Sequence, residues 1–119
     1  MDKNSRKELL EKFKQIKDYM GVVKITNKNN GKIFIESYPN LKNKWLTMQG
    51  QLNSGRHPNS QLQKDWHEMG ADAFVYEVLE EKESAEVTDM KWELKKIKKP
   101  WLEKFKPYAE RGYNKPPEE

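Results

Sequence analysis

The stretch from Gly21 to Ser37, GVVKITNKNNGKIFIES, constrains the fold of this chain most strongly. It holds two short runs of β-branched and aromatic residues, which favour a pleated and partly buried surface. Between the runs, Asn29-Asn30-Gly31 supplies residues that tolerate positive φ, as a tight hairpin requires. The stretch therefore predicts two antiparallel strands, and the remaining segments must cover this hairpin or extend its sheet.

Apolar residues at three- and four-residue steps predict helices on both sides of the hairpin. Residues 2–19 form the first such pattern, and Gly21 is expected to end that helix. After the hairpin, Asn40 can cap a second helix that continues to about Ser54. Residues 59–69 predict a third, short helix with its apolar side chains inward, which the following glycine ends.

The last predicted helix is the longest. Thr88 or Asp89 can cap it, and its apolar stripe runs from Leu94 to Phe105. Pro100 lies within this stripe, where a proline removes a hydrogen bond and clashes with the preceding turn at a cost of about 3 kcal/mol. We therefore expect a kink or two abutting helices there.

Residues 73–79 predict a third strand, and the acidic residues after it predict a loop. This strand must pair with one edge of the hairpin. The expected fold is a small α/β sandwich, in which a three-stranded antiparallel sheet is flanked by helices, with an extra N-terminal helix. We expect an N-terminal helix over 1–20, one domain over 21–114 and a proline-rich tail over 115–119.

Composition narrows the class of protein. The chain has 119 residues and no cysteine, which favours one domain without disulfides or thiolate metal sites. No apolar run approaches the roughly 20 residues of a membrane helix, and the first residues lack the apolar core of a signal peptide. We therefore expect a cytoplasmic protein with no membrane partner. A net charge of +4 is compatible with a polyanionic partner.

Several short segments follow one another in a fixed order along the chain. They are GVVKITN and NGKIFI of the hairpin, NLK with Trp45, QLNSGRH, LQKDW with Gly70, VLEE and GYN. In this order they resemble the GIY-YIG nuclease domain of homing-type members, from about Gly21 to Asn114. The resemblance implies a fold in which a tyrosine or an activated water attacks or assists at a phosphodiester, with one divalent cation held by a glutamate.

This chain departs from the family at its reactive positions. The two tyrosines that name the family fall at Val23 and Phe34, and the glycine after the second falls at Glu36. The family's arginine falls at Lys44, and a histidine one turn later falls at Met48. Valine cannot relay a proton, phenylalanine lacks the hydroxyl, and lysine lacks the planar fork that grips phosphate oxygens.

Other positions match the family. Glu93 aligns with the metal-binding glutamate of the last helix, so Mg²⁺ or Mn²⁺ is the expected cofactor if Glu93 is functional. His57 and Asn114 stand where some homing-type members have His and Asn. The resemblance predicts that five side chains line one hollow, namely Val23, Phe34, Glu36, Lys44 and Glu93.

We therefore predict a catalytically degenerate GIY-YIG-like domain that binds DNA or a nucleotide without cleaving it. Glu36 places a negative charge beside the expected phosphate, which costs on the order of 1 kcal/mol at 4 Å in water. The tryptophans of the last helix, Trp92 and Trp101, are expected to pack rather than to stack on bases. The basic residues expected to contact nucleic acid are Lys44, Arg56, Lys64, Lys95 and Lys99.

Three alternatives stay open. An active metal-dependent DNA endonuclease would use Lys44 and Glu93, with the Tyr38 hydroxyl in place of a lost tyrosine. A protein-interaction module would show a large exposed apolar patch and a neutral or acidic groove around Glu36. A protein that sequesters a nucleotide signal would use the same groove as a pocket.

Overall fold

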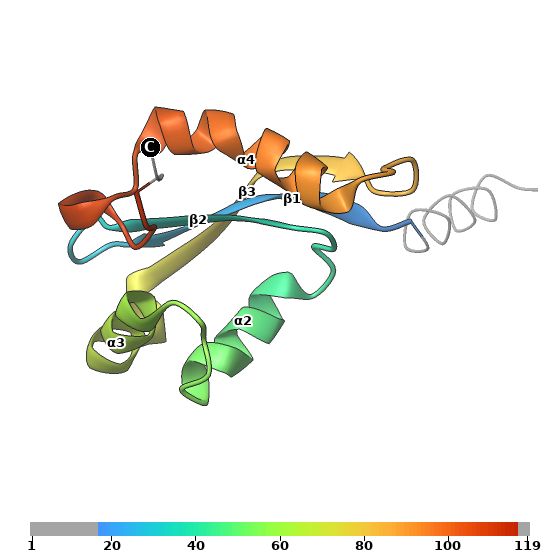
Figure 1. The fold of residues 1–119 in the computed structure, drawn as a ribbon. Coiled ribbons are helices and arrows are strands. Elements are labelled where there is room, and N and C mark those ends of the chain that lie inside the picture. The colour runs from blue at the N-terminus through green and yellow to red at the C-terminus, as the bar shows by residue number, and fades with distance from the viewer. Residues whose placement is uncertain (1–16, 117–119) are drawn as a thin grey trace, which may run out of the picture.

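The structure, a computed structural model that describes residues 17–116, has three layers (Figure 1). In chain order the elements are β1 (Tyr19–Asn27), β2 (Ile33–Tyr38), α2 (Lys44–Asn53), α3 (Ser60–Met69), η1 (Ala71–Ala73), β3 (Phe74–Glu83), α4 (Met90–Phe105) and η2 (Ala109–Arg111). The three strands form an antiparallel sheet of order β2-β1-β3. Helix α4 covers one face of this sheet, and α2 and α3 cover the other. The predicted α/β sandwich is confirmed.

The hairpin forms where the sequence predicts it. Backbone N–H of Asn27 donates to the Lys32 carbonyl at 2.9 Å, and the Gly31 N–H donates to the Asn27 carbonyl at 2.8 Å. Gly31 alone in this turn has positive φ, at 75°. The third strand pairs with β1, which makes β1 the central strand and leaves β2 and β3 as the two edges.

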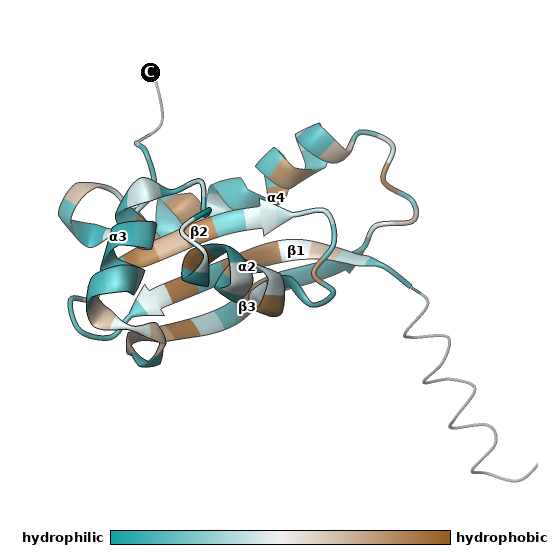
Figure 2. Cartoon of the chain, turned by 90° about the horizontal axis from the view of Figure 1, so that it is seen from below, coloured by the Kyte–Doolittle hydropathy of each residue, from teal (hydrophilic) through white to brown (hydrophobic). Residues whose placement is uncertain are grey.

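Two apolar cores lie on opposite faces of the sheet. Between the sheet and α2 and α3, the core includes Ile25, Phe34, Leu52, Leu62 and Trp66. Between the sheet and α4, the core is Met20, Val22, Ile35 and Ile97. Alternation along the strands divides side chains between these faces. Figure 2 shows the apolar residues along the strands where α2 and α3 cross the sheet.

Strand β3 is longer than predicted, because its acidic residues form strand and not loop. The register shifts between Val22, which pairs with Glu80, and Val23, which pairs with Val78. Leu79 is the extra residue of this bulge, and it packs against the core under α4. Charged side chains are tolerated on this strand because it is an edge, where they discourage pairing with other chains.

The N-terminal helix prediction is wrong at its end, and residues 1–16 lie outside the described part of the chain. Tyr19 and Met20 belong to β1, and Met20 is buried in the core under α4. Gly21 is inside this strand, opposite Glu81 of β3, and does not end a helix. Methionine at this position satisfies both the helical spacing and the strand alternation, so the apolar pattern alone could not separate them.

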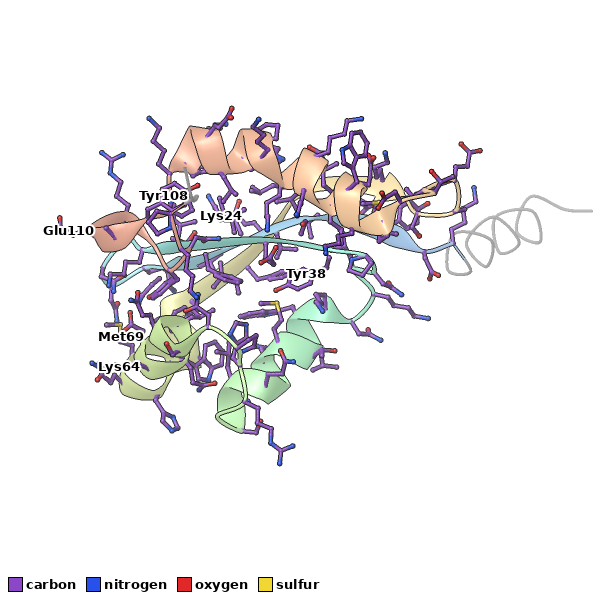
Figure 3. The ribbon with its side chains drawn as sticks, viewed as in Figure 1. Lys24, Tyr38, Lys64, Met69, Tyr108 and Glu110 are labelled. Atoms are coloured by element: carbon purple, nitrogen blue, oxygen red, sulfur yellow. The ribbon has the colours of Figure 1, made fainter. Side chains whose placement is uncertain are left out.

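Helix α2 begins later than predicted. Its N-cap is Asn43, in the left-handed region with φ of 55°, while Asn40 accepts the Lys42 N–H in the preceding turn. The predicted start of α3 is confirmed, and the Asn59 side chain caps this helix by accepting from the Leu62 N–H at 3.0 Å. At the end of α3, the predicted inward position of Met69 holds only in part, because 36% of this residue is exposed while its sulfur accepts from Asn27 Nδ2 at 3.0 Å (Figure 3).

Helix α4 is one continuous element through Pro100, so of the two predicted alternatives, a kink or two abutting helices, the second is wrong. Asp89 caps it by accepting the Trp92 N–H at 3.1 Å. Pro100 is exposed, so its ring lies on the solvent side of the helix and does not interrupt the apolar stripe. None of the described helices has the length and hydropathy needed to cross a bilayer.

Candidate functional site

A hollow of about 430 Å³ lies beside the outer edge of β2. Four segments that are distant in the sequence meet there: β2, the loop before α3, the second half of α4, and the C-terminal segment. The lining residues are Phe34, Glu36, Tyr38, His57, Pro58, Asn59, Lys98, Leu102, Asn114 and Lys115. Phe34, Glu36 and Tyr38 alternate along β2 and therefore present their side chains on the same face.

Asn114 closes part of the β2 edge. Its Oδ1 accepts the Ile35 N–H at 2.9 Å, and its Nδ2 donates to the Ile35 carbonyl at 2.7 Å. The neighbouring Tyr113 N–H donates to the Ile33 carbonyl at 3.0 Å. The C-terminal segment thus hydrogen-bonds with residues 33–35 of β2, through the Tyr113 backbone and the Asn114 side chain, and leaves the second half of β2 open to the hollow.

An ion pair occupies the hollow beside this open half. Lys98 Nζ lies 2.8 Å from Glu36 Oε1, and both side chains are partly buried. The same carboxylate oxygen accepts the Ser37 N–H at 2.9 Å. Ile97 points into the core, which places its neighbour Lys98 at the flank of α4 that faces β2. The negative charge of Glu36 is therefore compensated from α4.

His57 is held as a neutral side chain. It is 8% exposed, its Nδ1 accepts the Asn59 N–H at 3.0 Å, and its ring meets Phe34 edge to face with centroids 5.7 Å apart. Burial lowers the pKa of His57, and the nearby charge of Lys44 acts in the same direction. Because Nδ1 accepts a hydrogen bond, the proton of the neutral ring resides on Nε2, which makes Nε2 a donor.

The lowered pKa of His57 makes stability depend on pH. An unfolded histidine binds its proton near pH 6.5, whereas the folded ring binds it only at lower pH. Between these values the unfolded state holds more protons, so we expect stability to fall as the pH decreases below about 6.5. Thermal unfolding between about pH 8 and pH 5 should show a smaller loss for His57→Gln than for the parent.

His67→Gln, which removes an exposed histidine from α3, is the matched control for this measurement. It should keep the pH dependence of the parent. Equal losses of stability in His57→Gln and in the parent would contradict a buried neutral role for His57.

Tyr38 and Lys44 form the side of the hollow nearest α2. Lys44 Nζ lies over the Tyr38 ring, 4.0 Å from its centroid. Burial raises the pKa of Tyr38, and the charge of Glu36 raises it further. The hydroxyl therefore stays protonated and is available as a donor. Figure 3 shows Tyr38 below the sheet, on the side of α2.

The structure brings together some of the predicted site residues and separates others. Phe34 and Glu36 line the hollow, and Lys44 stands at its margin. Val23 is fully buried in β1 opposite Glu36 and does not reach the hollow. Glu93 and Lys44 are also absent from the lining, so three members of the predicted group do not line it.

Glu93 belongs instead to an ion pair with β3. Its carboxylate accepts from Lys82 Nζ at 2.6 Å, and the residue is 8% exposed. This hydrogen bond lowers the pKa of Glu93. The α4 side chains that face the hollow are Lys98 and Leu102, and Lys98 is not among the basic residues expected from the sequence to contact nucleic acid. The Glu93 carboxylate was expected on the α4 side of the hollow, and the ammonium group of Lys98 lies there instead.

The residues of the hollow do not fit a divalent cation. Glu36 is the one carboxylate on its lining, and Lys98 already binds it. Within residues 17–116, no group of three or more histidine, cysteine, aspartate or glutamate side chains is placed to hold a metal ion. Hard divalent cations require several oxygen ligands, so no catalytic step is assigned to a metal here.

The predicted nucleic-acid contacts lie in different places. Arg56 is exposed and directly precedes His57 of the hollow. Lys64 lies on α3, at the end of the molecule where Glu110 lies (Figure 3), and it lines a separate hollow with Lys32 and Glu110. Lys95 and Lys99 are exposed on α4, on the opposite face of the sheet. A single stretch of backbone at the hollow would meet the first of these groups and not all of them.

Comparison with solved structures supports the predicted fold. No family model matches the sequence, and no curated protein matches it. The chain is similar to a point mutant of the catalytic domain of the intron endonuclease I-TevI, with a TM-score of 0.65 and 23% identity over 81% of this chain and 92% of that one.

The catalytic domain of the homing endonuclease I-TevI gives a TM-score of 0.63 and 23% identity over 80% of this chain and 96% of that one. At this identity the likeness shows the fold alone. The predicted resemblance to a homing-type GIY-YIG domain is thus confirmed at the level of the fold.

Proposed function

We propose that this domain binds nucleic acid at the hollow beside β2 and does not cleave it by the route of the GIY-YIG family. The proposal is supported by the side chains that line the hollow. Where the resemblance puts the family's second tyrosine and the glycine after it, this chain has Phe34 and the Glu36–Lys98 ion pair. Phe34 has no reactive hydroxyl, and the negative charge of Glu36 is compensated by Lys98.

Cleavage requires a group that moves a proton and a group that stabilises the developing charge. Phe34 has no hydroxyl, and Val23 is fully buried. The Tyr38 hydroxyl stays protonated because burial raises its pKa, so it is a poor proton acceptor. General acid–base help alone contributes about 10² to 10⁴ in rate, so the loss of these roles removes most of the family's catalysis.

Binding requires only cations and donors beside the hollow, and these are present. Lys98 and Lys115 are on the lining, while Glu36 is its one acidic residue. Lys44 stands at the margin above Tyr38, and Arg56 adjoins His57. His57 adds the Nε2–H donor described above. Phosphate groups of DNA are attracted by such an arrangement, and the attraction weakens as salt is added.

A single nucleotide is a second candidate ligand. The volume of about 430 Å³ falls within the roughly 300–1,000 Å³ of small-molecule sites, and Phe34 supplies an aromatic wall. Competition separates the two candidates. A mononucleotide that displaces labelled duplex DNA at micromolar concentration would favour the nucleotide as ligand.

The proposal is tested by binding and cleavage assays on the same duplex DNA, with Mg²⁺ or Mn²⁺ present. We expect binding that weakens steeply with salt, and no cleavage products. Cleavage that is abolished by Lys44→Ala or Glu93→Ala would establish the active-nuclease alternative instead. Binding that does not change between low and high salt would also contradict the proposal.

Glu36→Gln should bind duplex DNA more tightly than the parent. The substitution removes a negative charge from the hollow and frees Lys98 to contact a phosphate. One such charge is worth on the order of 1 kcal/mol in water, so we expect about fivefold tighter binding, measured by fluorescence anisotropy. The salt dependence should become steeper by about one phosphate contact.

Glu77→Gln is the control, since it removes an acidic side chain from β3 at the other edge of the sheet, where Glu77 lies 3.6 Å from Lys24. Its affinity for duplex DNA should equal that of the parent. An equal gain in both variants would mean that net charge, and not the hollow, determines binding.

A further inference from the structure

Trp92 does not pack, contrary to the prediction from sequence. It lies near the start of α4 and is 56% exposed. Trp101 does pack, since it is partly buried, stacks on Phe105 and donates from Nε1 to Glu80 at 3.0 Å. The two differ in their place around the helix. Trp101 lies one turn after the buried Ile97, whereas Trp92 lies on the side that faces solvent.

Lysines surround this exposed indole. Lys91, Lys95 and Lys99 follow one another at four-residue steps and are all exposed, so they form a row along the outer side of α4. Lys96 lies beside this row, with its Nζ 5.0 Å from the centroid of the Trp92 ring. The row spans roughly 12 Å along the helix axis, so it can meet more than one phosphate of a strand. Glu103 is the exposed acidic residue further along this side.

We propose that this outer side of α4, called the Trp92 face, binds single-stranded nucleic acid. In this arrangement the indole stacks on one unpaired base, and the lysine row contacts the phosphates on either side of it. Base–aromatic stacking accepts any base because every base has a π face, so the site would have little sequence preference.

The geometry favours a single strand over a duplex. The bases of a duplex are already stacked on one another, and an indole on a convex helix cannot reach their faces. A duplex would therefore meet only the lysines and gain nothing from Trp92. An unpaired base offers its face to the ring.

The same face does not suit a membrane. Interfacial helices turn an apolar side toward the lipid. The apolar side of α4 is occupied by the sheet, where Ile97 belongs to the core shared with β1 and β2. On the outer side the tryptophan is accompanied by lysines and not by further apolar residues. Charge attracts a polyanion to this face, and the one exposed ring contacts its bases.

The Trp92 face borders the hollow but does not include it. Lys98 of the hollow lies three residues after Lys95 and is partly buried, whereas Trp92 is exposed and is not on the lining of the hollow. The proposal rests on Trp92 and not on the function assigned to the hollow, so Trp92→Ala tests it without changing that lining.

The test compares the affinity of the full chain for labelled oligothymidylate and oligouridylate of about 20 nucleotides and for a duplex of similar length. Trp92→Ala should weaken binding to a single strand by about 5- to 100-fold, the range of one base–aromatic stack, and leave duplex affinity nearly unchanged. The DNA and RNA arms show which backbone is preferred. Leu46→Ala, which truncates an exposed apolar residue of α2, is the control and should change neither affinity.

Tryptophan fluorescence and the salt dependence of binding give two further measurements of this site. Single-strand binding should quench tryptophan fluorescence in the parent and much less in Trp92→Phe. Lys95→Ala should reduce the slope of log affinity against log salt for the single strand by about 0.7. Unchanged single-strand affinity in Trp92→Ala, or equal losses on single strand and duplex, would overturn the proposal. So would a blue shift of Trp92 on phosphatidylglycerol vesicles with no binding of either oligonucleotide.

Discussion

The Gly21→Ala variant is expected to lose about 3 kcal/mol or more of its free energy of unfolding. A Cβ atom at this position would meet the backbone carbonyl oxygen of Glu80 well inside contact distance, and it would lie 2.8 Å from Leu41 Cδ1. The oxygen belongs to β3 and cannot move without disturbing its pairing with β1. The leucine could rotate away, but the strand could not.

Gly50→Ala is the matched control for this variant. Gly50 lies in the interior of α2, and a Cβ there would meet nothing within 4 Å. Alanine is the better helix former, so we expect this variant to gain about 0.5–1 kcal/mol. Urea unfolding followed by tryptophan fluorescence measures both variants. If Gly21→Ala stayed within about 1 kcal/mol of the parent, the close approach of β1 and β3 described here would be wrong.

Features with a local cause could be predicted from the sequence. The third helix was expected to begin at residue 59, and Thr88 or Asp89 was expected to cap the last one, because a short oxygen-bearing side chain before an apolar pattern satisfies the first free N–H groups. Asn59 and Asp89 are the residues that do so. Gly31 was expected in the hairpin turn, since that turn needs a residue with positive φ. These features depend on a few neighbouring residues, all of which are visible in the sequence.

Features with a distant cause could not be predicted. The acidic half of β3 forms strand because β1 offers it a partner, and its own composition favours loop. Met20 belongs to β1 because the core under α4 needs an apolar side chain there. In both cases tertiary pairing overrides the local preference, and the residues that supply it are far away in the chain.

Only part of the candidate site could be predicted, because the rest also depends on residues that are distant in the chain. The resemblance placed Phe34 and Glu36 on one hollow, and they share it because alternation along β2 turns both side chains to the same face. On α4, however, the choice between Glu93 and Lys98 depends on how the helix is rotated about its axis. That rotation is set by Ile97 against the sheet. The position of Lys98 next to this buried isoleucine was the signal available in the sequence, and the resemblance drew attention to a glutamate instead.

Asn114→Ala should have the second largest effect, a loss of about 2–4 kcal/mol in the free energy of unfolding. The substitution removes both hydrogen bonds to the Ile35 peptide group. A lost bond costs about 1 kcal/mol, and a buried group left without a partner costs up to about 3 kcal/mol. Ile35 is buried, so its N–H and carbonyl cannot readily exchange the asparagine for water.

Hydrogen exchange at the Ile35 amide reports this contact directly. In the parent the Ile35 N–H donates to Asn114 Oδ1, and in Asn114→Ala it should exchange faster than other amides of β2. Asn40→Ala, which removes an exposed asparagine that accepts one N–H in a turn, is the control and should cost less than about 0.5 kcal/mol. An Ile35 amide that stays protected in Asn114→Ala would show that another group pairs with this edge. The Asn114 side chain would then not be what holds the C-terminal segment against β2 at the margin of the hollow.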